Sequence, residues 1–161
     1  MNIACDQKKF SALMGKGHWL GLEVVMAKPQ TFMNLSGDAI QPMAAWYRIP
    51  TPNIVVIHDD IDIPFGEIRL KFAGGHGGHN GLRSIHQRLG DDSYYRIRVG
   101  VGRPHGGDVT NHVLGDFTTD EKIHFFKVLN YVTEAVICLL TSGFQQTMNQ
   151  YHGINLLAEI N

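Results

Sequence analysis

Two periods of apolar residues run through the chain, one typical of strands and one typical of helices. Residues 67–72 alternate between apolar and charged side chains, which predicts a half-buried strand. Residues 54–57 are continuously apolar, as in a strand buried on both faces of a parallel sheet. We expect another strand at 94–99, and a hairpin in which residues 10–14 pair with a strand at 22–27.

Helical spacing of apolar residues predicts two helices in the first part of the chain. One spans residues 40–47, where Pro42 should kink the helix or delay its start. The other spans residues 82–89, with one apolar face.

A long helix is expected near the C-terminus. A capping box from Thr118 to Glu121 marks its start, Gly143 marks its end, and a short helix should follow at 144–151. The expected buried stripe of the long helix is Ile123, Phe126, Leu129, Val132, Val136 and Leu139.

The order of these elements predicts an α/β fold. We expect a single domain over residues 1–161, with a mixed, mostly parallel twisted sheet and helices on both faces. A chain of 161 residues can bury a sizeable core, and its composition of 43% hydrophobic and 18% charged residues argues against disorder.

A glycine-rich run at residues 74–81 lies between an expected strand and an expected helix. Five of its eight residues are glycine, which allows left-handed backbone and close approach of a ligand. Asn80 is the expected N-cap of the helix. The run matches neither a P-loop nor a dinucleotide-binding fingerprint. Ligands gather beyond the carboxyl ends of strands in such folds, so we expect a binding loop, with a functionless surface loop as the alternative.

Two further segments carry polar groups. Residues 31–37 join Phe and Met to polar residues and suggest a contact surface, although Asn34 or Ser36 could simply cap the next helix. Asp59 follows the buried apolar run most closely and is our candidate for a functional carboxylate. Asp60 and Asp62 have a solvated acidic turn as their alternative.

Charge and cysteine content restrict the function classes. A formal net charge of −1 offers no global attraction to nucleic acid, so a polyanion would need a local basic face. We see no apolar run near the ~20 residues of a membrane span and no signal-peptide pattern. Cys138 is expected to be a buried thiol, which fits a reducing cytoplasm. Residues 106–112 are expected to form a mobile loop.

Three segments together resemble the bacterial peptidyl-tRNA hydrolase family. They are residues 32–37 (Phe-Met-Asn-Leu-Ser-Gly), 58–64 (His-Asp-Asp-Ile-Asp-Ile-Pro) and the glycine-rich run at 74–81. Their order and spacing match those of the family, and residues 96–102 match as well. The resemblance runs from about residue 9 to the C-terminus. It implies hydrolysis of the ester between a peptide and the 3′ ribose of tRNA, by a cytoplasmic monomer that recycles tRNA for translation without a metal or other cofactor.

The resemblance also implies roles for single residues. Asn34 and Asn80 would hold the substrate end and the reacting water, and His79 would lie beside them. Phe32 and Met33 would line the site for the 3′ end of the tRNA. Asp59 would orient the catalytic histidine and stabilise it as it takes a proton. Candidates for phosphate contacts are Arg69, Lys71, Arg83, Arg96 and Arg98, with a plain surface charge as the alternative for Arg83.

The chain departs from the family at its start. Family members begin with a β-loop-α unit whose Arg-His-Asn segment supplies the general base, and Met1 falls after the point where that unit should end. His18 lies in an expected turn and does not replace the base. Loss of a positioned base typically costs ~10²–10⁴-fold in rate, and loss of the strand would leave unpaired edges. A misassigned start, a fragment and a degenerate copy all remain open.

Two other functions are possible on this sequence. A metallohydrolase would use His58, Asp59, His76 and His79 as ligands, although a glycine-rich loop holds ligands poorly. A tRNA-binding remnant without catalysis would keep the RNA-binding face and lack the base.

Overall fold

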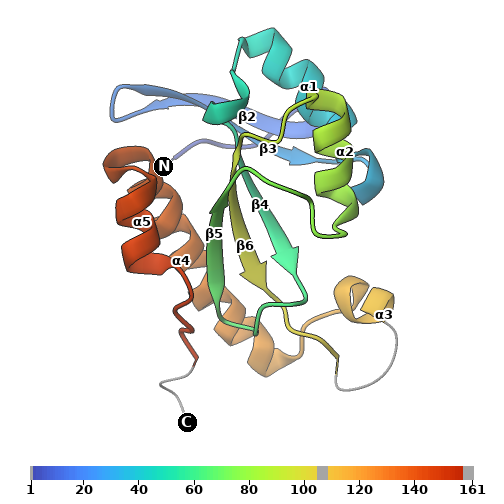
Figure 1. Ribbon diagram of the computed structural model, residues 1–161, viewed down its shortest axis with the longest axis vertical. Helices are drawn as coiled ribbons and strands as arrows, with labels where there is room; N and C mark the ends of the chain where they lie inside the picture. Colours follow the sequence, from blue (N-terminus) through green and yellow to red (C-terminus); the bar gives the residue numbers. More distant parts are fainter. Residues whose placement is uncertain (1, 105–108, 158–161) are drawn as a thin grey trace. The chain divides into compact units, whose positions relative to one another are not determined.

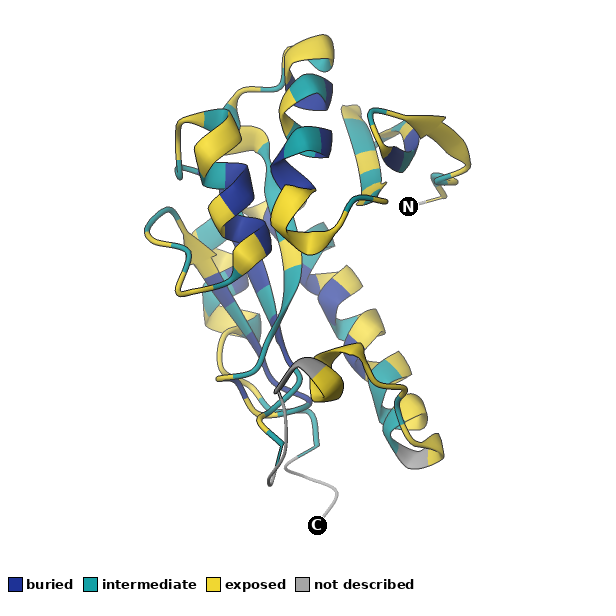
Figure 2. Ribbon diagram, turned by 90° about the vertical axis from the view of Figure 1, so that its right-hand side faces the viewer, coloured by how far each residue is buried: buried dark blue, intermediate teal, exposed yellow. Residues whose placement is uncertain are grey.

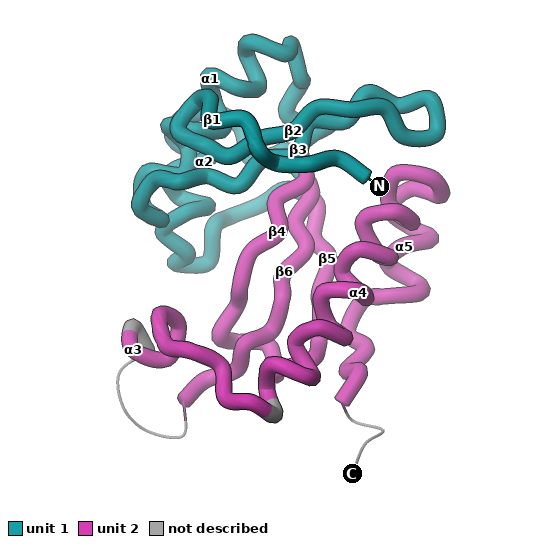
Figure 3. The backbone as a smooth tube through the Cα atoms, turned by 180° about the vertical axis from the view of Figure 1, so that it is seen from behind, with its two compact units in different colours: residues 1–54, 73–94 teal, residues 55–72, 95–161 magenta. Residues whose placement is uncertain are grey.

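The chain folds into two compact units in the computed structural model, which describes residues 2–104 and 109–157. One unit comprises residues 1–54 and 73–94, and the other comprises residues 55–72 and 95–161, as Figure 3 shows. Each unit contains a three-stranded sheet (Figure 1).

The first unit contains an antiparallel sheet in the order β1-β2-β3. Its strands are β1 (Gln7–Lys9), β2 (Ala12–Trp19) and β3 (Leu22–Pro29). The expected hairpin is confirmed, and it is longer than expected because β2 continues to Trp19. Leu20 and Gly21 both have positive φ, 47° and 78°, which is the two-residue turn that suits twisted hairpins.

Four helical segments complete this unit: η1 (Met33–Leu35), α1 (Ser36–Tyr47), η2 (Thr51–Asn53) and α2 (Asn80–Leu89). α1 runs through Pro42, so the expected delay of its start is wrong. The buried apolar residues Ala12, Ala39 and Met43 form a core between the sheet and α1.

The second unit contains a mixed sheet in the order β4-β6-β5. Its strands are β4 (Val55–Asp60), β5 (Ile68–Phe72) and β6 (Tyr95–Gly100). β4 and β6 are parallel, whereas β5 is antiparallel to β6. The α/β class with a mixed sheet is therefore confirmed. The expected parallel majority is not found, because tight hairpins such as β2–β3 can only join antiparallel strands.

β4 does not have the double burial that its apolar run predicted. It lies at the edge of its sheet, and the side chain of Ile57 is 51% exposed. The central strand is β6, in which Arg96, Ile97 and Val99 are buried. An apolar run fixes the strand but not its position in the sheet, because that position depends on pairing with distant residues.

Helices α3 (Val109–Leu114), α4 (Thr119–Ser142) and α5 (Phe144–Tyr151) belong to the second unit. α3 occupies part of the expected mobile loop at 106–112, and residues 106–108 lie outside the described residues. The capping box is confirmed by hydrogen bonds in both directions between Thr118 and Glu121. α4 ends at Gly143, which has φ of 80°, and α5 has the expected limits.

α4 buries the expected stripe in its C-terminal half and a different face in its N-terminal half. Val128, Val132 and Ala135 pack into a core with Ile68 and Ile97. Figure 2 shows buried and exposed segments alternating along the helices. Three residues of the expected stripe are instead exposed: Ile123, Phe126 and Leu129. Val132, Leu139 and the thiol of Cys138 are buried as predicted.

α4 also contains an apolar stretch of the length of a membrane span, which was not expected from the sequence. Residues Glu121–Ser142 are long and apolar enough to cross a membrane by length and composition, since they contain an 18-residue window with a mean hydropathy of 1.5. This is weak evidence of a span, because core helices pass the same test, and α4 supplies Val128, Val132 and Ala135 to the core of its unit.

Candidate functional site

The glycine loop at residues 73–78 has an unusual backbone. Ala73, Gly74, Gly77 and Gly78 have φ values of 56°, 88°, 58° and 84°, in the left-handed region that favours glycine. A Cβ atom built on Gly75, Gly77 or Gly78 would have no atom within 4 Å. These glycines are therefore not required for packing against the protein. They shape the loop and leave its backbone open to an approaching group.

His79, rather than Asn80, is the N-cap of α2. Its backbone is extended, and its Nδ1 accepts hydrogen bonds from the N–H groups of Gly81 at 3.1 Å and Leu82 at 3.2 Å. With Nδ1 accepting, the neutral ring carries its proton on Nε2. The expected cap at Asn80 is wrong because Asn80 is already the first helical residue, and its side chain is exposed.

The segment from Phe32 to Gly37 packs closely against the start of α2. The N–H of Gly37 donates to Ser84 Oγ at 3.0 Å. A Cβ atom on Gly37 would lie 2.3 Å from the Ser84 carbonyl oxygen, and one on Gly81 would lie 2.6 Å from Met33 Sδ. The structure therefore brings Met33, His79 and Gly81 together. Ser84 was not among the residues expected at the site, although its position beside Ile85 on the expected apolar face was a signal.

Several side chains of this segment are available to a ligand. Phe32 is 81% exposed and Met33 is 52% exposed, and Asn34 is exposed as well. The alternative that Asn34 or Ser36 caps α1 is wrong, because the helix has no side-chain cap and Ser36 Oγ donates to the Met33 carbonyl oxygen at 2.8 Å. Exposed apolar and amide groups thus lie on a segment that is fixed to α2. Exposure of such groups does not contribute to the stability of the fold, so it favours a binding role.

In the second unit, alternation along the strands gathers polar side chains on one face of the sheet. The register aligns His58 with Arg98, and Arg98 with Arg69. Arg98 makes an ion pair with Asp60 at 2.8 Å, and Arg69 makes one with Glu67 at 2.6 Å. Both guanidinium groups therefore already have carboxylate partners.

Lys71 and Arg96 differ in their availability to a phosphate. Lys71 is exposed, and it has no ion pair with another described residue. Arg96 is only 2% exposed, on the central strand β6. The expectation that Arg96 contacts phosphate is thus wrong for this structure, because a side chain so buried does not reach the surface.

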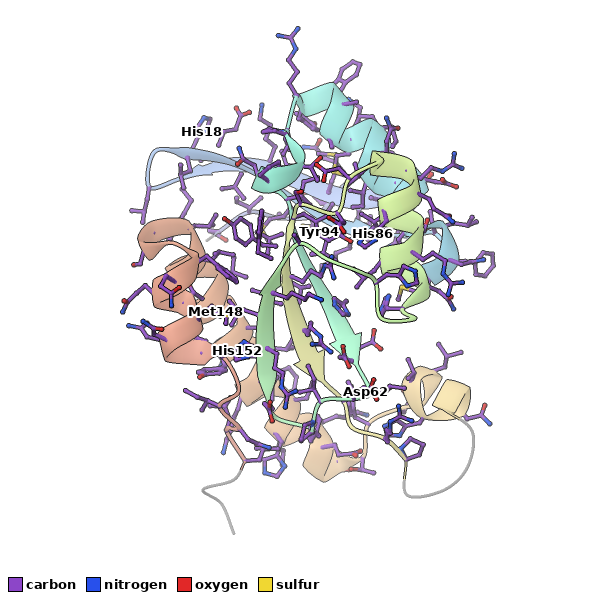
Figure 4. The ribbon with its side chains drawn as sticks, in the orientation of Figure 1. His18, Asp62, His86, Tyr94, Met148 and His152 are labelled. Atoms are coloured by element: carbon purple, nitrogen blue, oxygen red, sulfur yellow. The ribbon has the colours of Figure 1, made fainter. Side chains whose placement is uncertain are left out.

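The acidic turn after β4 is only partly solvated. Asp60 is held by Arg98 and accepts the N–H of Asp62 at 3.0 Å, so a solvated role is wrong for Asp60. Asp62, labelled in Figure 4, makes an exposed ion pair with Arg103 at 2.5 Å.

Asp59 is the next-to-last residue of β4 and is partly buried. Its carbonyl oxygen lies 2.7 Å from His58 Nδ1, so Nδ1 of the neutral ring is the donor. Asp59 belongs to the second unit, whereas Asn34, His79 and Asn80 belong to the first. The meeting of Asp59 with the two amides stays a prediction.

The metal-site alternative has no support in the described part of the chain. No group of three or more His, Cys, Asp or Glu side chains is placed there to hold a metal ion. His76 and His79 each use Nδ1 to accept backbone N–H groups, at 3.1 Å for His76 and Gly78. Such bonds favour a structural use of these rings.

Comparison with known proteins gives one consistent match. The family described as "Peptidyl-tRNA hydrolase" matches residues 1–159. The chain is 44% identical over 155 residues to the peptidyl-tRNA hydrolase of Geotalea uraniireducens (strain Rf4), covering 96% of this chain and 81% of the relative. The identity to the Geobacter sulfurreducens protein of that name is 45% over 158 residues, with 98% and 82% covered.

Solved structures agree with this match. The crystal structure of peptidyl-tRNA hydrolase from Acinetobacter baumannii has a TM-score of 0.83 to this chain and 34% sequence identity. The similarity covers 93% of this chain and 79% of that one. A complex of peptidyl-tRNA hydrolase with N-propanol is equally similar, with a TM-score of 0.83.

Proposed function

Because this chain belongs to the peptidyl-tRNA hydrolase family, it is a carboxylic ester hydrolase of peptidyl-tRNA, and we propose that segment 32–37 and the start of α2 hold the acylated 3′ end. The observation that supports this assignment most is the close packing of the two segments at Gly37 and Gly81. It fixes exposed Phe32, Met33 and Asn34 on one support with Asn80.

The exposed side chains suit an RNA terminus that carries a peptide ester. A nucleic-acid base can stack on an aromatic ring such as Phe32, and such stacking is worth about 1–3 kcal/mol per base. The amides of Asn34 and Asn80 each offer donors and an acceptor, which can hold a ribose hydroxyl, the ester carbonyl or a water molecule. The open backbone of the glycine loop adds room for the chain of the substrate.

The chemical step needs an activated water. We assign to Asp59 the orientation of a general-base imidazole and the stabilisation of its charged form after it takes the proton. We do not assign the base to His79, because its Nδ1 already accepts two N–H groups at the start of α2. His79 instead supports the residues that contact the substrate.

Phosphate contacts are assigned to the exposed basic residues. Lys71 is the first candidate, because it is exposed and has no carboxylate in an ion pair within the described residues. Arg83 is exposed on α2. Arg69 and Arg98 would contact phosphate while keeping or exchanging their carboxylate partners, Glu67 and Asp60. We further propose that the protein acts as a monomer in the cytoplasm, where translation supplies its substrate.

Replacement of Asn80 by Ala tests the assignment. Hydrolysis of an N-acetyl-aminoacyl-tRNA should fall about 10²-fold or more in kcat/KM, as when a donor that stabilises the transition state is removed. Asn130→Ala, which removes an exposed amide from α4, should leave hydrolysis unchanged. Equal turnover by Asn80→Ala would contradict the site. Tight tRNA binding without any turnover by the unsubstituted chain would favour a tRNA-binding remnant.

A further inference from the structure

We propose that His86 is a positioning residue for this reaction, which it serves by linking the glycine loop to buried Tyr94 through a stack of three rings. The third ring is that of His76, the only side chain larger than methyl between Ala73 and Gly78. This inference rests on the proposed function of Asn80 and the loop, and it adds His86 and Tyr94, which were not candidate site residues from sequence.

The three rings form a continuous series of edge contacts. The centroids of His76 and His86 are 5.9 Å apart with planes at 63°, and those of His86 and Tyr94 are 5.4 Å apart at 69°. Both distances lie in the range of favourable edge-to-face pairs. Tyr94 is fully buried, and Figure 4 shows His86 beside it. The stack therefore runs from the interior of the unit to the loop.

The loop is held by Tyr94 at two points. At its start, the N–H of Ala73 donates to the Tyr94 carbonyl oxygen at 3.1 Å. At its middle, His76 reaches Tyr94 through His86. A loop with four residues in the left-handed region has many alternative conformations, and such double attachment reduces the entropy cost of fixing one of them.

His76 passes this restraint on to the start of α2. Its Nδ1 accepts the N–H of Gly78 at 3.1 Å, and its carbonyl oxygen accepts the N–H of His79 at 3.0 Å. His79 in turn caps α2, directly before Asn80. A shift of the His76 ring should therefore alter the position of the amide proposed to contact the substrate. A role of the two imidazoles as a metal pair is disfavoured, because no described residue adds a third ligand.

Two substitutions at one position separate the stack from the rest of the fold. His86→Ala removes the middle ring, whereas His86→Phe keeps an aromatic edge, in a somewhat larger ring, and removes the ring nitrogens. Gln87→Ala, at the exposed neighbouring position of α2, is the control. The probes are amide hydrogen exchange and binding of 3′-(N-acetyl-phenylalanylamino)-3′-deoxyadenosine, an amide analogue of the substrate's 3′ end that is not hydrolysed by the ester reaction.

His86→Ala should speed exchange at the Gly78 and His79 amides about three- to tenfold, the scale expected from loss of an aromatic pair. It should weaken binding of the analogue by a similar factor and raise KM more than it lowers kcat. Exchange along β2 and β3 of the same unit should not change, which excludes general destabilisation of that unit. His86→Phe should restore most of the loss in both measurements, and Gln87→Ala should match the parent protein.

Unchanged exchange of the loop in His86→Ala would overturn the proposal, whatever the result with Asn80→Ala. Faster exchange with unchanged affinity for the analogue would also overturn it, because the stack would then not serve the reaction. Failure of His86→Phe to recover either property, in a variant as stable to urea as the parent protein, would overturn the proposal, because an aromatic ring at this position would then not be what holds the loop. Asn80→Ala reports on the proposed function separately.

Discussion

Glycine residues serve the candidate site in two different ways. At Gly37 the missing side chain allows contact, because a Cβ atom would lie 2.3 Å from the Ser84 carbonyl oxygen. At Gly77 and Gly78 it allows a left-handed backbone in open space. The first kind should be sensitive to added volume and the second to added conformational restriction.

Replacement of Gly37 by Ala should destabilise the protein by about 1–3 kcal/mol, the usual cost of inserting volume into a close contact. The opposing atom is a backbone oxygen, which cannot rotate away as a side chain could. Urea unfolding measures the change in free energy. The matched control is Gly75→Ala, where the new Cβ meets no atom within 4 Å. Equal stability of the two variants would show that segment 32–37 can move away from α2 without cost.

The same scale shows which site residues could be chosen from sequence. The polar, glycine-rich run pointed to His79 and Asn80, and the structure places both at the start of α2. The cap was expected at Asn80 because Asn is the commoner N-cap residue. The actual cap is His79, whose Nδ1 reaches the first N–H groups of the helix only because its backbone is extended. The burial of Arg96 could not be predicted from alternation alone. Alternation assigns a side chain to one face of the sheet, but it does not say whether other elements cover that face.

The helix α4 was predicted correctly as an element, but its buried face was predicted correctly only in the C-terminal half. The expected stripe from Ile123 to Leu139 has a mean spacing of about 3.2 residues, shorter than the 3.6 residues of a helical turn, so it drifts around the helix. The buried residues Val128, Val132, Ala135 and Leu139 keep close to one face. The helix itself was predictable from its capping box and from Gly143, because these signals are local.

The burial of Val128 and the exposure of Phe126 predict very different losses of stability when either side chain is truncated. Val128→Ala should cost about 2 kcal/mol, because it removes two buried methyl groups and leaves a cavity in the core with Ile97. Phe126→Ala removes a much larger side chain, yet its stability should change by less than about 0.5 kcal/mol because the ring is 66% exposed. Thermal unfolding of both variants checks the order, and a larger loss with Phe126→Ala would restore the stripe expected from sequence.

The capping box of α4 should make stability depend on acid. The pKa of Glu121 is lowered, first by its hydrogen bond to the Thr118 backbone and then by that to the Thr118 side chain. Since the folded pKa lies below the ordinary value of 4.5, this stabilisation is present above pH 4.5 and is lost as the pH falls through the folded pKa.

Unfolding of the parent protein and of Glu121→Gln, compared from pH 7 to pH 3, measures this contribution. The difference in unfolding free energy should be constant above the ordinary pKa of 4.5 and shrink below it. A difference that grows toward acid would require a raised pKa and so contradict the carboxylate's role in the box.

The charge of the whole molecule bears on how it can bind RNA. The net charge of −1 hides an uneven division, because residues 1–54 and 73–94 contain seven basic and five acidic residues, and the remainder contains seven and ten. Neither unit attracts RNA strongly by its total charge. Binding of tRNA must therefore depend on a few exposed cations such as Lys71, rather than on a general field.

This leads to a prediction for the salt dependence of tRNA binding. Each phosphate contact that is removed should reduce the slope of log Kd against log salt by about 0.7–0.9, because fewer counterions are released. Lys71→Ala should therefore weaken binding at low salt and lower the slope by about one contact. Lys122→Ala removes the same charge from the exposed surface of α4 and should leave the slope unchanged. If both variants lowered the slope equally, binding would follow total charge, and the assignment of a local contact to Lys71 would be wrong.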